Sequence, residues 1–478
     1  MLPLARLFCS IRTMLRPPQR PLIAVIGATG TGKSNLAIDL AERFNGEIIN
    51  GDAMQLYAGL PIITNKIPVE EQRGVKHHLL GCIGLEEETW TVQTFVNKAL
   101  GVIDEIRSRG RLPILVGGSH YYTQALLFRD QLNAELSEEE YQHTIDSRKP
   151  YPILDEPTEA IWEKLNEVDP VMAARWHPKD RRKIQRSLEI WLKTGRKASE
   201  VYEEQRLRKS LNAGGPVGGA EDKLDITPMG FRFPTLLFWV YAATGALSTR
   251  LDYRIDAMLE NGLLDEVRKM HEYLQEQETH GRFVDKTRGI WQSIGYKQFE
   301  DYTVALQSTN TSEKDLAKLR MSGVEQMKGA TRRFSKRQAR WIRIKLFNAL
   351  REFDALSNLF LLDGTDIKTW NDNVQSPAFN VCSKFLKSHE LPSPTSLSSA
   401  ASEMLQPLKG YDLSQRQDLW ERRTCEFCNT VTVTEDAWLL HIKSRPHKIR
   451  KRKAQTVDRV EIPKLEANDA LARSNRSP

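Results

Sequence analysis

The sequence predicts an α/β fold with a phosphate-binding loop (P-loop) on a parallel sheet, a mostly helical insertion and a small C-terminal C2H2 zinc finger. Three observations lead to this prediction. Short β-branched apolar runs alternate with helical patterns, the polar stretch 128–225 interrupts the alternation, and two cysteines and two histidines lie close together near the C-terminus. Strands that alternate with helices are typical of doubly wound α/β domains.

Five apolar runs have the length and composition of buried parallel strands. They are 21–27 (PLIAVIG), 46–52 (GEIINGD), 112–118 (LPILVGG), 235–242 (TLLFWVYA) and 359–364 (LFLLDG). Apolar residues at helical spacing predict helices at 33–44, 92–110 and about 313–350.

Composition sets the expected domain boundaries. These are a targeting segment at 1–20, the core at 21–127 and 226–365, the insertion at 128–225, a linker at 366–420, the finger with a basic segment at 421–453, and a tail at 454–478. The insertion ends in a Gly-rich stretch, 211–223, which is typical of a flexible loop. The linker is expected because 391–403 is rich in Ser and Pro.

Bulk composition excludes several classes of protein. With 478 residues, 40% hydrophobic and 27% charged, the chain is typical of a globular protein of two or three domains. No apolar run approaches the roughly 20 residues of a membrane-spanning helix. The five cysteines are too few and too scattered for a disulfide framework. The net charge of +7 weakly favours a polyanionic partner.

The N-terminus predicts organelle import. Residues 1–38 contain no acidic residue, and arginines recur among apolar residues, as in mitochondrial presequences. A merely basic tail is the alternative. A second start at Met14 would remove much of the signal, so mitochondrial and cytoplasmic locations are expected. The basic run 447–453 (HKIRKRK) is either a nuclear import signal or a phosphate contact.

A glycine-rich turn between the first strand and the first helix predicts an anion site. GATGTGKS matches the phosphate-loop pattern at every fixed position: Gly27, Ala28, Thr29, Gly30, Thr31, Gly32, Lys33 and Ser34. Glycines let several backbone N–H groups face one anion, and the following helix adds its positive end. The turn therefore predicts a diphosphate-like ligand held by Lys33, with Mg²⁺ on the Ser34 hydroxyl.

The neighbouring strands argue against nucleotide hydrolysis. The strand LPILVGG ends in Gly117, Gly118 and Ser119, where a hydrolase would usually carry a metal-binding aspartate. The exposed carboxylate is instead Asp52, at the end of GEIINGD. A carboxylate beside an anion site is suited to act as a base toward a second substrate. This arrangement favours group transfer from a diphosphate.

Seven stretches together resemble one family, the tRNA dimethylallyltransferases (tRNA isopentenyltransferases). They are GATGTGKS, INGDAMQLYAGLPIITNK, VGGSHYYTQALL, DRRKIQRSLEIWLKTGRKAS, RLDYRIDAMLENGLLDEV, GIWQSIGYKQF and GATRRFSKRQARWIR, in this order between residue 21 and about 345. The C-terminal finger is similar to that of the eukaryotic members. The resemblance implies transfer of a dimethylallyl group from dimethylallyl diphosphate to N6 of the adenine on the 3′ side of the tRNA anticodon.

The resemblance also implies roles for individual residues. Asp52 matches the family's base, and Thr29 its threonine at the diphosphate bridge. Arg250 and Arg254 are both candidates for a clamp on the diphosphate, with Arg250 slightly preferred. The residues expected to contact the tRNA anticodon stem-loop are Asp52, Ala53, Met54, Gln55, Ser119, Gln185, Arg186, Ser187, Leu188, Glu189, Arg333, Lys336 and Arg340.

Two positions depart from the family pattern. Ala53 stands where the family commonly has Ser, which removes a hydroxyl, and Ser119 stands where it has Thr, which keeps one. The extruded adenine is expected at Gln55 and the preceding loop, and extrusion from a single-stranded loop costs only a few kcal/mol.

A basic stripe is expected on the long C-terminal helix. Arg333, Lys336, Arg340 and Arg343 recur every three or four residues, with aromatic residues between them. Such a stripe can follow an RNA backbone, although on its own it is as often a solvated helix face. The helical part of the core would then line an RNA channel.

The C-terminal cluster has the spacing of a structural zinc site. Cys425, Cys428, His441 and His447 follow the pattern C-x₂-C-x₁₂-H-x₅-H. Zinc would hold together a module too small to fold alone. We expect the finger to bind RNA as an accessory to the enzyme.

Two other functions remain open on the residues alone. A small-molecule or nucleotide kinase on the same loop would require a second metal-binding carboxylate, for which no strong candidate exists. A non-catalytic RNA-binding protein would be expected to have lost part of the set Thr29, Lys33, Ser34 and Asp52, which is complete. Nothing demands a dimer, and a monomer is expected.

Overall fold

The computed structural model describes residues 18–128, 151–212, 230–282, 284–308, 311–406 and 420–454. The chain forms two compact units, Met1–Leu132 with Gly218–Gln406, and Asn133–Val217 with Pro407–Pro478. Most of the expected targeting segment, most of the Gly-rich loop and nearly all of the expected tail lie outside the described residues.

A parallel six-stranded sheet forms the first unit, in the order β3-β2-β4-β1-β5-β6. Its strands are β1 (Leu22–Gly27), β2 (Gly46–Asn50), β3 (His77–His78), β4 (Leu112–Gly117), β5 (Thr235–Tyr241) and β6 (Leu359–Asp363). The predicted fold class is confirmed. The sequence did not reveal β3, because two consecutive histidines carry neither the length nor the apolar character of a strand.

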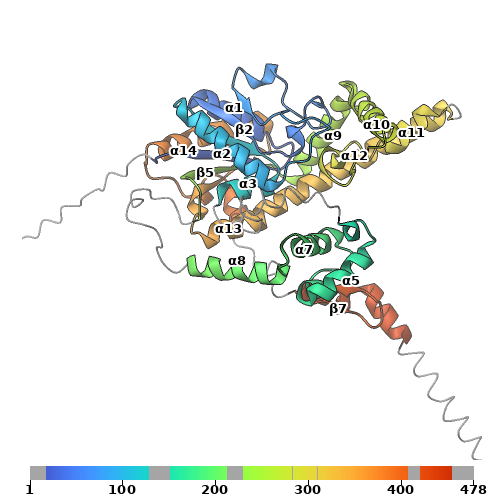
Figure 1. Cartoon of the computed structure of the whole chain (residues 1–478). Coiled ribbons are helices and arrows are strands. Elements are labelled where there is room, and N and C mark those ends of the chain that lie inside the picture. Colours follow the sequence, from blue (N-terminus) through green and yellow to red (C-terminus); the bar gives the residue numbers. More distant parts are fainter. Residues whose placement is uncertain are drawn as a thin grey trace, which may run out of the picture. The chain divides into compact units, whose positions relative to one another are not determined.

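The strands are buried on both faces, which is why they are almost continuously apolar. In β1, Leu22, Ala24 and Ile26 face one core cluster, and Ile23 and Val25 face the other. The second cluster is covered by α1 (Lys33–Arg43) and α14 (Ser376–Leu386). The first cluster is covered by α2 (Val92–Ser108), α3 (His120–Leu127), α9 (Thr244–Glu260), α10 (Leu263–Thr279) and others (Figure 1).

The expected linker 366–420 is wrong over its described first part, 366–406. Val374, Ala378, Val381 and Cys382 are fully buried against the sheet, and α15 (Ser399–Met404) buries Ala401. The spacing i, i+4, i+7, i+8 of those four residues is that of an amphipathic helix. The Ser/Pro-rich stretch 391–403 covers part of the connection between α14 and α15 and runs into α15 itself.

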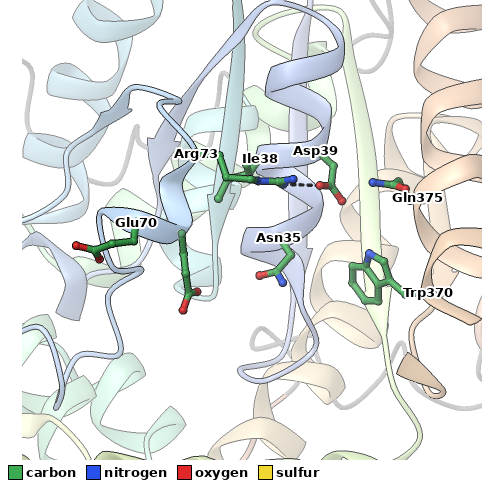
Figure 2. A pocket seen from close by; sticks show the side chains of 8 residues that line it. Asn35, Ile38, Asp39, Glu70, Arg73, Trp370 and Gln375 are labelled. Carbon is green, nitrogen blue, oxygen red and sulfur yellow. Dashed lines mark hydrogen bonds and ion pairs between the residues drawn. The ribbon is translucent and has the colours of Figure 1, made fainter. Parts of the chain in front are cut away.

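This segment also covers the glycine turn. Gly32 has no room for a side chain, since an added Cβ would lie 2.5 Å from the Trp370 ring. Trp370 and Gln375 form one side of a hollow of about 560 Å³, and Asn35 and Asp39 of α1 lie across it (Figure 2). Asp39 accepts a hydrogen bond there from Arg73. Residues 366–406 therefore belong to the first unit.

The longest helix, α12 (Glu313–Trp341), begins at Ser312, whose hydroxyl accepts from the Asp315 N–H. It packs against α9 and α11 (Glu300–Gln307), as Figure 1 shows. Arg332 donates to both oxygens of Asp252 of α9 at 2.6 Å, and Lys328 pairs with Asp256 at 2.6 Å. A π-helical turn (Ile342–Leu346) and α13 (Phe347–Glu352) follow.

The second unit combines the insertion with the finger. Its helices are α5 (Thr158–Val168), α6 (Pro170–Arg175), α7 (Arg181–Thr194) and α8 (Ala198–Asn212), followed in the finger by β7 (Arg423–Thr424), β8 (Val431–Thr432) and α17 (Glu435–Lys443). Lys183 of α7 lies over the rings of Trp176 and Trp420, with its Nζ 5.1 and 4.8 Å from their centroids. His177 contacts the Val431 carbonyl at 3.2 Å. The two predicted modules thus share one packed body.

Among the described residues, no helix combines the length and the apolar character that a membrane crossing requires.

The buried position of α14 makes a stability prediction. Val381→Asp places a charge in a fully buried site and should destabilise the fold by more than about 3 kcal/mol. Asn380→Asp introduces the same residue at an exposed position of the same helix and should change little. Thermal unfolding and soluble yield are the measurements. Equal behaviour of the two variants would show that 366–406 does not belong to the core.

Candidate active site

The glycine turn joins β1 to α1 at the carboxyl edge of the sheet. Gly30 and Gly32 have φ angles of 81° and 90°, which only glycine adopts easily. The Thr31 hydroxyl donates to the Ala28 carbonyl at 2.9 Å and closes the turn. This geometry points the start of α1, with its free N–H groups, toward the site.

Lys33 lies half-buried at this edge. Its Nζ donates to the Ala28 carbonyl at 3.4 Å. Burial lowers the pKa of Lys33 to about 8, and the negative charge of Asp52 partly opposes this shift. An anion in the turn would add a second negative partner and favour the charged lysine.

Asp52 follows β2 and is held by its neighbours. Its N–H donates to the Asn50 side chain at 3.0 Å, and its Oδ1 accepts from the Met54 N–H at 3.0 Å. Asn50 is buried and also donates to the Leu79 carbonyl at 2.8 Å. Burial raises the pKa of Asp52, although Lys33 opposes the shift. A carboxylate with a raised pKa is a stronger base than an ordinary aspartate.

The two candidate arginines lie in different places. Arg254 Nη1 donates to the Thr29 hydroxyl at 2.9 Å, and its buried Nε has no partner among the described residues. Arg250 instead donates to the Thr365 carbonyl. Of these two arginines, Arg254 is therefore the better candidate for the clamp, because among the described residues it has a hydrogen bond to the glycine turn and Arg250 bonds elsewhere.

Gln338 of α12 is a residue of this site that the sequence did not single out. It is buried, its Oε1 accepts from the Thr29 N–H at 2.8 Å, and its Nε2 donates to the Gly118 carbonyl at 2.9 Å. It lies in the stretch GATRRFSKRQARWIR. The sequence marks this stretch by its positive charges, and no local pattern predicts that its one glutamine is buried.

The residues after β2 and β4 form the other side of the site. Ser119 accepts from the Ala53 N–H at 2.9 Å, so its hydroxyl fixes the turn after Asp52. Gln55 donates to the Asn65 carbonyl at 2.9 Å, which ties it to the loop that follows. Glu266 of α10 binds the backbone of this loop. Its carboxylate accepts hydrogen bonds from the Ile62 and Ile63 N–H groups at 2.9 and 2.7 Å.

Of the five predicted RNA contacts on α7, two are buried and three are half-buried. Ser187 and Leu188 are buried in the core of the insertion, and the Ser187 hydroxyl accepts from the Trp176 indole at 2.9 Å. Their assignment to an RNA surface is wrong, because a helix with a packed face must turn part of any five-residue stretch inward. Gln185, Arg186 and Glu189 are only half-buried.

The basic stripe is interrupted at its end. Arg333, Lys336 and Arg340 are exposed on α12, as expected. Arg343 lies in the π-helical turn, where its Nε is buried. The wider turn rotates the chain, so Arg343 leaves the stripe.

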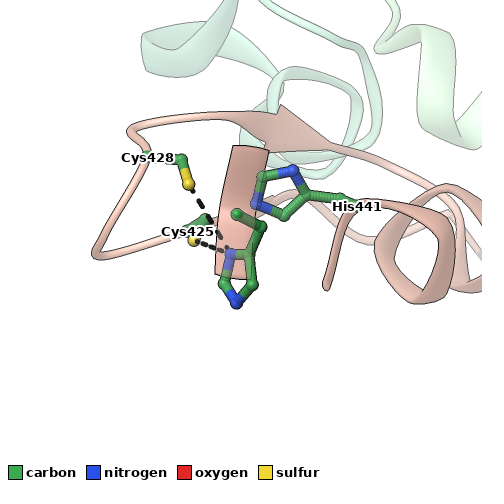
Figure 3. A group of neighbouring side chains, drawn as sticks. Cys425, Cys428 and His441 are labelled. Atoms are coloured by element: carbon green, nitrogen blue, oxygen red, sulfur yellow. Dashed lines mark hydrogen bonds between the residues drawn. The ribbon is translucent and has the colours of Figure 1, made fainter. Parts of the chain in front are cut away.

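Four side chains of the finger form a potential metal site (Figure 3). The ligand atoms of Cys425, Cys428, His441 and His447 lie within 4.8 Å of one another. His447 Nδ1 is 3.4 and 3.6 Å from the two sulfurs. His441 Nε2 is buried without a hydrogen-bond partner among the described residues. Tetrahedral zinc holds its ligands roughly 3.3–3.8 Å apart, so the cluster fits a metal ion.

Comparison with known proteins gives the family. The family model described as IPP transferase matches residues 55–345. The chain belongs to the IPP transferase family. It is 36% identical to a tRNA dimethylallyltransferase of Schizosaccharomyces pombe, over 93% of this chain and 98% of that protein. It is 33% identical to the human tRNA dimethylallyltransferase, over 97% and 93% of the two chains.

Structural similarity agrees with this membership. A crystal structure of a eukaryotic dimethylallyltransferase acting on tRNA matches this fold with a TM-score of 0.69 and 32% identity, over 93% of this chain and 100% of that one. The comparisons support the prenyltransferase interpretation over a kinase. Within this family fold, Thr29, Lys33, Asp52 and Arg254 converge on one end of the sheet.

The positions of the two arginines make a binding prediction. Arg254→Ala should weaken binding of inorganic diphosphate roughly 10- to 100-fold, the effect of losing one hydrogen bond to a charged group. Arg250→Ala, which removes a contact with Thr365, should have a much smaller effect. Calorimetric titration with diphosphate and Mg²⁺ measures both. A larger loss in Arg250→Ala would restore the other assignment.

Proposed function

We propose that this chain transfers a dimethylallyl group from dimethylallyl diphosphate to N6 of the adenine on the 3′ side of the tRNA anticodon. The observation that carries the proposal is the meeting of a cationic glycine turn with one half-buried carboxylate. Lys33 and Thr29 follow β1, Asp52 follows β2, and β4 alone separates these strands. One substrate's leaving group and the other's nucleophile can therefore face each other.

The diphosphate would occupy the glycine turn. Backbone N–H groups at the start of α1, the ammonium of Lys33 and the guanidinium of Arg254 offer hydrogen bonds and positive charge. As the bond from C1 of the prenyl group to the bridging oxygen breaks, negative charge grows on the leaving diphosphate. Groups already aimed at that charge stabilise the transition state more than the ground state.

Mg²⁺ fits the beginning of α1. Ser34 is half-buried, and its hydroxyl makes no hydrogen bond among the described residues, so it is free to ligate a hard cation. The diphosphate and water would supply the remaining oxygens. The ion would offset the charge of the leaving group.

Asp52 would act on the acceptor. The exocyclic amine of adenine is a weak nucleophile because its lone pair is delocalised into the ring. The Asp52 carboxylate would accept a hydrogen bond from N6–H, orient the amine toward C1 and take the proton as the N6–C1 bond forms. The products are the prenylated adenine, diphosphate and a protonated Asp52, which then releases the proton to water.

RNA would be held by surfaces on both units. Arg333, Lys336 and Arg340 offer phosphate contacts along α12. Gln55 and Ser119 lie beside Asp52, where they can contact the extruded base. The finger would add an RNA contact held together by zinc, since its small sheet and two short helical segments offer little core of their own. The Arg-rich N-terminus supports a mitochondrial location, and a second start at Met14 would support a cytoplasmic one.

The first experiment tests donor, acceptor and base together. Purified protein is incubated with Mg²⁺, dimethylallyl diphosphate labelled in the prenyl group, and unmodified tRNA, followed by nucleoside analysis. We expect label on N6 of the adenine next to the anticodon. Asp52→Asn should reduce turnover about 10²- to 10⁴-fold with tRNA affinity nearly unchanged. Glu70→Gln, an exposed carboxamide control, should match the wild type.

Two outcomes would contradict this proposal. Absence of label, with ATP binding and phosphate transfer instead, would identify a kinase. Wild-type turnover in Asp52→Asn would remove Asp52 from the role of base.

Metal analysis tests the finger. The wild type should contain about one zinc per chain, and Cys425→Ser should contain almost none, because three ligands hold zinc far less tightly than four. Cys82→Ser, at an exposed cysteine outside the cluster, is the matched control. Loss of zinc should raise the Michaelis constant for tRNA and leave the turnover number nearly unchanged. Zinc retained in Cys425→Ser would show that the cluster does not hold the metal.

A further inference from the structure

We infer that Gln338 is a positioning residue for prenyl transfer, which holds the glycine turn in register with the residues around Asp52. This inference rests on the proposed function. It is carried by one buried amide whose two ends bond to two different strand ends. Among the described residues, no hydrogen bond joins Gln338 to Asp52. Gln338 would therefore act through the two groups that it holds, Thr29 and Gly118.

The first contact fixes Thr29. Gln338 Oε1 accepts from the Thr29 N–H at 2.8 Å, while the Thr29 hydroxyl accepts from Arg254 at 2.9 Å. Both the backbone and the side chain of Thr29 are therefore tethered. The direction of the threonine hydroxyl, and with it the position of Arg254, depends on the amide of Gln338.

The second contact fixes the end of β4. Gln338 Nε2 donates to the Gly118 carbonyl at 2.9 Å. The next residue, Ser119, donates its N–H to Gly51 at 3.3 Å and accepts from the Ala53 N–H with its hydroxyl. Gly51 and Ala53 flank Asp52. The same amide therefore connects the diphosphate side of the site with the segment that carries the base.

The surroundings leave the amide little freedom. Gln338 is 4% exposed. Three residues further along α12, Trp341 stacks on the ring of His120 with centroids 4.8 Å apart and planes 14° apart. On the preceding turns, Arg332 and Lys328 pair with α9, the helix that bears Arg254. A side chain confined in this way can set positions to within a fraction of an ångström.

Gly118 is shaped for this contact. A Cβ at this position would lie 2.5 Å from Gln338 Nε2, too close for any ordinary contact, and 3.4 Å from Asp52 Oδ2. The closeness of the backbone to the amide is thus the reason for glycine at 118. An alanine there would push the amide away without changing α12.

The test compares substitutions that remove the amide's hydrogen bonds in two ways. Gln338→Met keeps most of the volume and removes both bonds, and Gly118→Ala displaces the amide from the other side. Both should lower the turnover number roughly 10- to 100-fold, as expected for a misplaced reacting group, with the Michaelis constant for tRNA changed less than about threefold. Ser335→Ala removes a buried hydroxyl of the same helix that bonds only within it, and should match the wild type.

A double-mutant cycle with Thr29→Ala separates positioning from general stability. If Gln338 acts through the Thr29 hydroxyl, Gln338→Met should cost less than about threefold in turnover when Thr29 is already alanine. A loss that follows the melting temperature of each variant would overturn the inference, and equal losses in both backgrounds would overturn the link through Thr29.

The same series distinguishes this inference from the proposed function. Normal turnover of Gln338→Met by an active wild-type enzyme would refute the positioning role alone. A wild type without any prenyl transfer would refute the proposed function itself. Should Gln338→Met fail to fold, Gly118→Ala gives the decision, because its substitution lies outside the helix core.

Discussion

Lys33 and Asp52 lie close together, both half-buried, at the carboxyl edge of the sheet, and the remainder of the site depends on this pair of opposite charges. Burial moves the pKa of each group toward its neutral form, and the charge of the partner opposes both shifts. An anion bound in the turn would favour the charged lysine, and the raised pKa makes the carboxylate a stronger base. The fold supplies this balance by ending β1 and β2 on the same edge, one strand apart.

The helix α12 connects this pair with the outside of the molecule. Its exposed side carries Arg333, Lys336 and Arg340, and its buried side carries Gln338. A rigid helix of 29 residues with ion pairs to α9 is suited to hold both surfaces in a fixed relation. The single helix α12 therefore carries both the side chains suited to phosphate contacts and the amide that fixes the glycine turn.

The second unit combines two small modules, the insertion and the finger, which need each other for stability. The finger has two strands of two residues each, the helix α17 and a short helical segment at 445–454, too little to bury a core of its own. The potential metal site supplies one constraint. Packing of Trp420 and Arg422 onto the insertion, with Lys183 between Trp176 and Trp420, supplies another. The insertion and the finger thus support each other.

The sequence by itself determined five of the six strands of the sheet, the glycine turn, Asp52 and the four metal-ligand candidates. Each is a local signal: strands buried on both faces are continuously apolar, a phosphate turn requires glycine at fixed positions, and metal ligands recur at short intervals. The resemblance to one family rested on seven stretches, two of which contain the glycine turn and Asp52.

Only the tertiary structure decided which side chains meet across the chain. Arg250 and Arg254 are equivalent on a helix surface until a neighbour 225 residues away, Thr29, distinguishes them. Gln338 bonds to residues 309 and 220 positions away, and no local pattern marks such a contact. The sequence predicts an RNA-facing surface at Ser187 and Leu188, but packing turns both side chains inward. It predicts a linker at 366–406, but the helix α14 in this segment covers the sheet. Burial depends on the partner surface, and that surface exists only once the chain has folded.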